Sequence, residues 1–232
     1  TSIPPSTALY IDLEGHKLSR NGTISLITIL LHPEKIIKII DILALGASEV
    51  FLTGASAFTI TPQNNPKKSL KSILEDKNIP KCLWDVRNDA DALWALYKVN
   101  LAGITDIQLL ENASRPRGNT YLFGLDKAMQ IDLCPTLGYL KYTSWKNTKT
   151  WITRKLSDTD VFSVRPLDAR TIEYCANDVT YLPALREVYM ARIKPEWLEK
   201  AKDQSMRRVQ EAQFAGYQPH SPEKRKGPWG SQ

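Results

Sequence analysis

The stretch ALYIDLEGH, residues 8–16, decides the predicted fold. It is an apolar run that carries two carboxylates, Asp12 and Glu14, one residue apart. In an extended strand the side chains alternate between faces, so Ile11 and Leu13 are expected in a core while the two carboxylates share the other face. Two like charges at that separation repel unless a cation lies between them, and oxygen donors suit Mg²⁺ or Mn²⁺. The pattern therefore indicates a strand with a candidate metal site; an amphipathic strand with one solvated face is the alternative.

Composition and charge limit the classes of protein to which the chain can belong. The 232 residues, 42% of them hydrophobic, can bury one sizeable core, and we expect one α/β domain with an appendage. No window approaches the ~18 uninterrupted apolar residues of a membrane span. Because the first residues also lack a signal-peptide pattern, we expect an intracellular protein, in the nucleus or cytoplasm, without a membrane partner. Three cysteines without CxxC spacing argue against a disulfide framework and a zinc site, and the net charge of +6 favours a polyanionic partner.

Hydrophobic periodicity gives the order of the predicted elements. After the first strand, two β-branched runs can extend an antiparallel meander, and helices then alternate with two short strands. Further strands are predicted at residues 23–31, 35–43, 81–86 and 103–109, and helices at 69–76 and 88–99, followed by short helices from 111 to 140. Ser69 is the expected N-cap of the first helix. This order is typical of an α/β domain.

An acidic residue falls at the start of the second helix. The sequence NDADALWALYKV, residues 88–99, begins with Asn88 or Asp89 as a candidate N-cap. This position lies just beyond the C-terminal end of a strand, at the edge of an α/β sheet where ligands bind. Asp89 is therefore a candidate ligand, with an ordinary helix cap as the alternative.

Aromatic and basic residues are interleaved in KYTSWKNTKTWITRK, residues 141–155. This segment contains five basic residues and no acidic one. Cations can contact a phosphate backbone and rings can stack on bases, although a solvated face over a hydrophobic lid is an equal alternative. The candidate nucleic-acid-binding residues are Trp145, Lys146, Lys149, Trp151 and Arg154.

A long helix is predicted over residues 166–189. Tyr174 and Asp178 are four residues apart and therefore share one of its faces. A charged amphipathic helix follows, and then a tail rich in Pro, Gly and Lys, for which we expect flexibility. We accordingly expect one domain over residues 1–193, with a C-terminal helix and a basic, flexible tail over residues 194–232.

Three of these pieces, taken in order, resemble the motifs of a known superfamily. The DxE of the first strand, an Asp at a strand-to-helix junction and YxxxD on a late helix are similar to the three motifs of the DEDD 3′-5′ exonucleases. The Tyr marks the DEDDy branch. The match looks closest to ribonuclease D-like exonucleases, and WDVRNDADAL, residues 84–93, resembles an intracellular group of such domains common in fungi. The resemblance covers residues 8–189.

The resemblance carries functional residues onto this chain. It puts a catalytic tyrosine and four metal-binding carboxylates at Tyr174, Asp12, Glu14, Asp89 and Asp178. The chain departs from the ribonuclease D pattern at Trp84, where a His often stands. That departure affects the expected binding of the substrate more than the expected catalytic reaction.

Three acidic residues are candidates for the acid of the second motif. Asp85, Asp89 and Asp91 all lie in one short stretch. In the family the acid begins a helix whose apolar residues fall four, five and eight places later. Counted from Asp89, these places hold Leu93, Trp94 and Tyr97. Asp89 is therefore the better match, and Asp91 is the alternative.

The resemblance also implies a fold and a chemistry. The fold is ribonuclease H-like α/β, a mixed sheet of about five strands with helices on both faces. The cofactors are two divalent cations, Mg²⁺ or Mn²⁺, which support an in-line displacement that releases 5′-mononucleotides. Tyr174 orients the attacking water, since an unperturbed phenol of pKa ~10 is a poor base at neutral pH. The implied partner is single-stranded nucleic acid, with RNA favoured over DNA, and no protein partner can be inferred.

Two other functions stay open at the level of sequence. A DNA-directed repair or proofreading exonuclease would carry the same five motif residues, because the 2′-OH is read by contacts that no motif reveals. A catalytically inactive scaffold that binds nucleic acid would be expected to lack one or more of the acids. None of them is missing.

Overall fold

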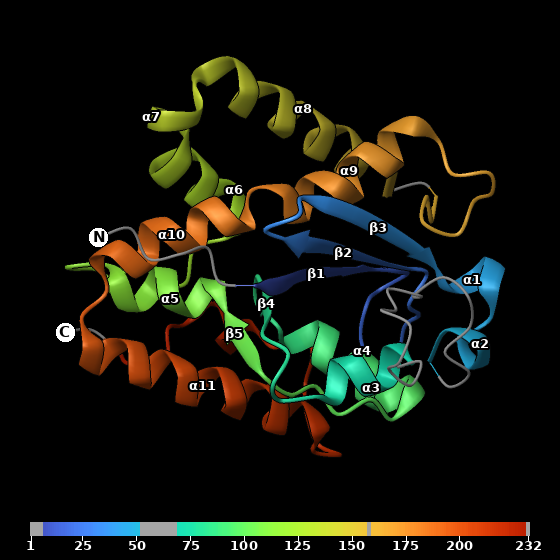
Figure 1. Cartoon of the computed structure of the whole chain (residues 1–232), viewed down its shortest axis with the longest axis horizontal. Coiled ribbons are helices and arrows are strands. Elements are labelled where there is room, and N and C mark those ends of the chain that lie inside the picture. Colours follow the sequence, from blue (N-terminus) through green and yellow to red (C-terminus); the bar gives the residue numbers. More distant parts are fainter. Residues whose placement is uncertain (1–6, 52–68, 157–158, 231–232) are drawn as a thin grey trace.

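The fold is built on one mixed sheet of five strands (Figure 1). The computed structural model describes residues 7–51, 69–156 and 159–230. The sheet has the order β3-β2-β1-β4-β5, in which β1 pairs antiparallel with β2 and parallel with β4. The strands are β1 (Ala8–Glu14), β2 (Leu26–His32), β3 (Ile36–Asp41), β4 (Lys81–Leu83) and β5 (Ile104–Asp106). The predicted α/β class and the sheet of about five strands are confirmed.

β1 is the central strand, and its alternation is the one predicted. Ile11 and Leu13 lie in the core on one face of the sheet. Tyr10 is buried on the other face, in a second core cluster formed with helices, and Asp12 and Glu14 continue that row. Helices cover much of this face, and Asp12 and Glu14 are half-buried in it.

Helices cover both faces of the sheet (Figure 1). Helices α3 and α4 pack on the face of Ile11, whereas α5, α8, α9 and α10 pack on the opposite face. None of the helices in the described ranges is long and apolar enough to cross a membrane. The bounds are α1 (Ile42–Leu45), α2 (Ala47–Phe51), α3 (Leu70–Glu75), α4 (Arg87–Tyr97), α5 (Ile107–Ser114), α6 (Leu125–Ala128), the π-helical turn η2 (Met129–Leu133), α7 (Cys134–Leu137), α8 (Tyr139–Leu156), α9 (Ala169–Thr180), α10 (Leu182–Arg192), α11 (Pro195–Gln213) and the 3₁₀ turn η3 (Pro222–Arg225).

One predicted helix cap is confirmed and one is wrong. The Ser69 side chain accepts a hydrogen bond of 3.1 Å from the Ser72 backbone N–H, as expected for an N-cap. Helix α4 instead begins at Arg87, so its N-cap is Val86, which has no side chain able to accept. Asn88 or Asp89 is therefore not the cap, and the partners of this helix start come from elsewhere in the chain.

The single helix predicted over residues 166–189 is two helices. Helix α9 begins at Ala169 and ends at Thr180, and α10 begins at Leu182. Pro183 lacks an N–H, and its ring would clash with the carbonyl four residues earlier, so the α9 ladder cannot continue through it. The break leaves Tyr174 and Asp178 together on α9.

The C-terminal segment packs on the domain. Helix α11 contacts α4, α5 and β5. Beyond it, Lys226 forms a bridge with Tyr121, and the Gly227 N–H donates to the Thr120 carbonyl at 2.8 Å. The helix predicted within residues 194–232 is present as α11, and the tail beyond it, for which flexibility was predicted, contacts the domain at Lys226 and Gly227.

Candidate active site

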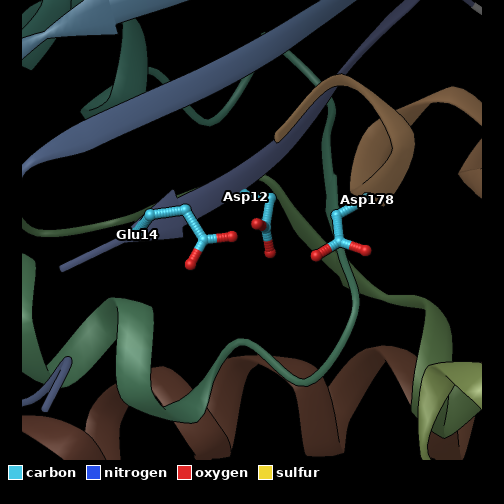
Figure 2. A group of neighbouring side chains, drawn as sticks. All are labelled: Asp12, Glu14 and Asp178. Atoms are coloured by element: carbon cyan, nitrogen blue, oxygen red, sulfur yellow. The ribbon is translucent and has the colours of Figure 1, made fainter. Parts of the chain in front are cut away.

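Three carboxylates meet beside the central strand. β1 supplies Asp12 and Glu14 because residues two apart on a strand share a face, and α9 supplies Asp178. One oxygen atom from each lies within 4.8 Å of the others. Figure 2 shows the three side chains next to one another, with Asp12 in the middle. Residues from opposite ends of the chain therefore form one acidic group.

The surroundings make negative charge costly in this group. Burial, and then repulsion from Asp178, raise the pKa of Asp12 from 3.8 to about 7. Burial, and then the charge of Asp12, raise the pKa of Glu14 well above its ordinary value. Carboxylates placed so close together are stabilised in the charged form by a bound cation.

Asp89 lies outside this group of three but belongs to the same electrostatic region. It stands in the first turn of α4 and is 7% exposed. Burial, and then the charge of Asp12, raise its pKa well above the ordinary value. Its Oδ1 atom is buried without a hydrogen-bond partner among the described residues. A buried carboxylate oxygen normally has a partner, so this unpaired oxygen and the three carboxylates together fit a divalent metal with oxygen ligands.

Tyr174 and Lys149 complete the polar lining. Burial, followed by the charge of Glu14, raises the pKa of Tyr174 well above its ordinary value, so its phenol stays protonated at neutral pH. The Lys149 Nζ atom, from α8, lies 3.5 Å from Asp178 Oδ1 and 5.7 Å from the centre of the Tyr174 ring. Lys149 therefore places a positive charge inside the acidic group.

The site opens as a cleft of about 330 Å³. Besides the residues already described, it is lined by Trp84, Asp85, Gln108, Gly124 and Leu125. Sequence reasoning considered Asp85 only as an alternative second-motif acid and missed Gln108, which no motif spacing marks. Arg87 holds the Asp85 carboxylate through both oxygens, at 2.5 and 2.6 Å. Asp85 is therefore already neutralised, unlike Asp89.

The predicted nucleic-acid-binding residues are spread around α8. Trp145 is 2% exposed and lies in a core cluster, so its expected stacking on a base does not agree with this position. Lys146 lies 3.5 Å from Asp126 at the surface, Trp151 is half-buried, and Arg154 is exposed. Of the five residues, only Lys149 lines the cleft.

Comparison with known proteins identifies the class. A family described as 3′-5′ exonuclease matches residues 5–191, and the chain therefore belongs to that family. This confirms the predicted class of enzyme domain, a hydrolase that acts on phosphodiester bonds. No curated protein shows significant sequence similarity to the chain.

Solved structures of RNase D and related nucleases share the fold. RNase D of Trypanosoma brucei is 21% identical with a TM-score of 0.67, over 90% of this chain and 66% of that chain. Escherichia coli RNase D is 21% identical with a TM-score of 0.61, over 90% and 46% of the two chains. Brucella melitensis NrnC is 17% identical with a TM-score of 0.59, over 93% and 91%. The predicted ribonuclease H-like fold is thereby confirmed, and the chain spans less than two thirds of either RNase D.

Proposed function

We propose that the chain is a metal-dependent exonuclease that removes 5′-mononucleotides from the 3′ end of single-stranded RNA. The observation that carries this proposal is the convergence of Asp12, Glu14 and Asp178 beside Asp89, whose buried Oδ1 has no partner in the described ranges. All five residues of the DEDDy pattern are present in this one region. An inactive scaffold has no need of such a concentration of carboxylates that repel one another.

The roles follow from the chemistry of each side chain. Asp12, Glu14, Asp89 and Asp178 would hold two divalent cations, Mg²⁺ or Mn²⁺, by their oxygens. When bound, such a pair supplies activation of a water molecule and neutralisation of the leaving 3′ oxygen. Tyr174 keeps its proton at neutral pH, so it orients the attacking water by hydrogen bonding and does not act as a base. Lys149 offers a cation to the phosphate of the incoming strand.

Related structures support RNA as the substrate. Trypanosoma brucei RNase D has been solved in complex with RNA U12 and with GMP, and Brucella melitensis NrnC has been solved with pGG. Escherichia coli RNase D is described as an exoribonuclease involved in structured RNA processing. Lys146, Trp151 and Arg154 on α8 would extend the contact with the strand beyond Lys149. The likeness to the fungal group of such domains remains a resemblance of one stretch, residues 84–93.

The proposal is tested by digestion of matched single-stranded RNA and DNA that carry labelled 5′ ends. With Mg²⁺ or Mn²⁺ we expect RNA to shorten from its 3′ end with release of 5′-mononucleotides, and excess EDTA should abolish the reaction. Asp178→Asn should be inactive. The matched control is Asp203→Asn, which removes an exposed acid from α11 and should be as active as the wild type.

Each alternative has its own outcome in this assay. Full activity in excess EDTA would contradict the metal site. Faster digestion of DNA than of RNA would make the chain a DNA-directed exonuclease. Binding of both strands with digestion of neither would favour a scaffold.

A further inference from the structure

Helix α11 lies beyond the segment that matches the exonuclease family and packs under the candidate site. It runs along α4 and β5 (Figure 1). Most of its charged residues are exposed, but Arg208 is 3% exposed, on the buried side with Ala201 and Val209. A buried guanidinium must have partners, and its partners show what it does.

Among the described residues, the partners of Arg208 are two residues that line the cleft and one buried acid next to them. Its Nη1 lies 2.6 Å from Asp106 Oδ2 and 3.0 Å from Gln108 Oε1. The same atom lies 3.5 Å from Asp85 Oδ1. Asp85 and Gln108 line the cleft, whereas Asp106 is fully buried at the end of β5.

Asp106, the N-cap of α5, also holds the backbone just before α4. One of its carboxylate oxygens accepts from the Asp85 N–H at 3.0 Å, and the other accepts from the Val86 N–H at 3.0 Å. These are the two residues directly before Arg87, where α4 begins. The Val86 N–H, at the N-cap position, has no partner within the helix, and here its acceptor comes from the end of β5.

The backbone before α4 is held in an uncommon conformation. Asp85 has a φ of 60°, in the left-handed region that non-glycine residues rarely adopt. Such a conformation persists only where surrounding contacts impose it. Three contacts impose it here. The Asp106 carboxylate accepts from the Asp85 N–H, and the guanidinium groups of Arg87 and Arg208 lie against the Asp85 carboxylate. The same turn sets the position of Asp89, one helical turn later.

We propose that Arg208 is a positioning residue for the candidate metal site. It neutralises Asp106, which holds the backbone N–H groups of Asp85 and Val86 before α4, and thereby fixes where the Asp89 carboxylate lies. Without the guanidinium, the buried Asp106 carboxylate loses its cation, Asp85 keeps only Arg87, and the restraint on the start of α4 weakens. The proposal rests on the proposed metal-binding function of the site and assigns to α11 a part in that function.

The test compares Arg208→Met and Arg208→Lys with the wild type. Mn²⁺ binding is measured by electron paramagnetic resonance, RNA digestion as kcat and KM, and folding by thermal unfolding. Loss of a partner that supports metal ligands weakens metal binding about 10-fold or more, so Arg208→Met should bind Mn²⁺ that much more weakly. Its kcat should fall at saturating RNA while KM changes little. Arg208→Lys should be intermediate, because its ammonium ends one bond short of the Nη1 position.

A neighbouring arginine provides the matched control. Arg207 is exposed on the same helix, so Arg207→Met and Arg207→Lys should leave Mn²⁺ affinity and kcat unchanged. Wild-type Mn²⁺ affinity and kcat in folded Arg208→Met, even with a lower melting temperature, would overturn the proposal and leave Arg208 a purely structural residue. If Arg208→Met does not fold, the same criterion applies to Arg208→Lys.

The outcomes separate this proposal from the proposed function. A wild-type protein that binds Mn²⁺ but digests no RNA overturns the exonuclease, while weaker Mn²⁺ binding by the Arg208 variants still supports the positioning role. If the wild type digests RNA, and its Arg208 variants bind Mn²⁺ and digest RNA equally well, only the positioning role is overturned. Absence of Mn²⁺ binding by the wild type overturns both.

Discussion

Asp89 and Asp91 are two residues apart on α4 and both are buried, yet among the residues that the structure describes only Asp91 has a cationic partner. The backbone N–H and the Nε of Arg20 each donate to the Asp91 carboxylate at 2.7 Å. Asp89 Oδ1 has no hydrogen-bond partner in the part of the chain that the structure describes. Asp91 is therefore a structural ion pair, and Asp89 is the acid left available for a metal.

This difference predicts opposite effects of Asp89→Asn and Asp91→Asn. Asp89→Asn should cost at least about 100-fold in turnover, because even partners that only support a ligand cost about 10–100-fold. Its melting temperature should not fall, since a repelling charge is removed. Asp91→Asn should lower stability by about 2 kcal/mol, or roughly 4–8 °C, with turnover per folded molecule retained. Side-by-side kinetics and thermal unfolding check this, and the reverse ranking would move the metal ligand to Asp91.

The basic residues of α8 predict a change in salt dependence. Replacing Lys146, Lys149 and Arg154 together by Gln should weaken RNA binding and flatten its dependence on salt. Each lost phosphate contact lowers the slope by about 0.7 for a single strand. The matched control is a triple Gln variant of exposed cations on α11, at Lys200, Lys202 and Arg207. An unaltered slope in the α8 variant would exclude that segment as a guide for the strand.

The two tryptophans of α8 should respond differently to replacement by Ala. Trp145 is buried, so Trp145→Ala should lower stability by about 3–5 kcal/mol while the affinity of folded protein for RNA stays the same. Trp151 is half-buried, and if its ring stacks on a base, Trp151→Ala should cost about 1–3 kcal/mol of binding free energy. Binding titrations beside thermal unfolding distinguish the two. Loss of affinity in Trp145→Ala at an unchanged melting temperature would contradict its place in the core.

Glu111 on α5 predicts a pH-dependent stability. Its side chain is fully buried, and burial raises its pKa from 4.5 to about 7 even though Arg115 Nε lies 2.8 Å away. The folded state therefore holds a proton on Glu111 that the unfolded state releases, so this contribution to stability falls as pH rises from about 4.5 to about 7. Glu111→Gln should melt at a higher temperature than the wild type at pH 8 and at nearly the same temperature at pH 5.

A control variant tests whether burial is the cause. Glu211 on α11 is exposed, so Glu211→Gln should show the same small difference from the wild type at both pH values. An equal effect of Glu111→Gln at pH 5 and pH 8 would mean that Arg115 offsets the burial of Glu111 completely.

The features that sequence predicted are those set by local periodicity. The alternation of β1 places Asp12 and Glu14 on one face whatever the strand packs against, and the helical repeat places Tyr174 and Asp178 together. The spacing of apolar residues after Asp89 agreed with a helix that points this acid toward the site. These few geometric rules, with the order of the motifs, were enough to assemble the candidate site.

The features that sequence missed depend on contacts between distant parts of the chain. The turn before α4 is held by Asp106, at the end of β5, which accepts from the Asp85 and Val86 N–H groups. Trp145 lies in the core because of how α8 packs, which its basic neighbours do not reveal. The burial of Arg208 on α11 has no local signal at all. Tertiary contacts decide such positions, and a single sequence does not display them.

The acids of the site come from opposite ends of the chain, with β1 near its start and α9 near its end. As a ribosome makes the protein, β1 and β2 can pair soon after they emerge, because their contacts are close in sequence. Asp178 joins them only after α9 has been synthesised, and Arg208 follows later still. A polypeptide that stops before α9 thus displays a pair of repelling carboxylates and no complete site. On the proposed function, a product of translation interrupted before α9 would lack a metal ligand and would not digest nucleic acid.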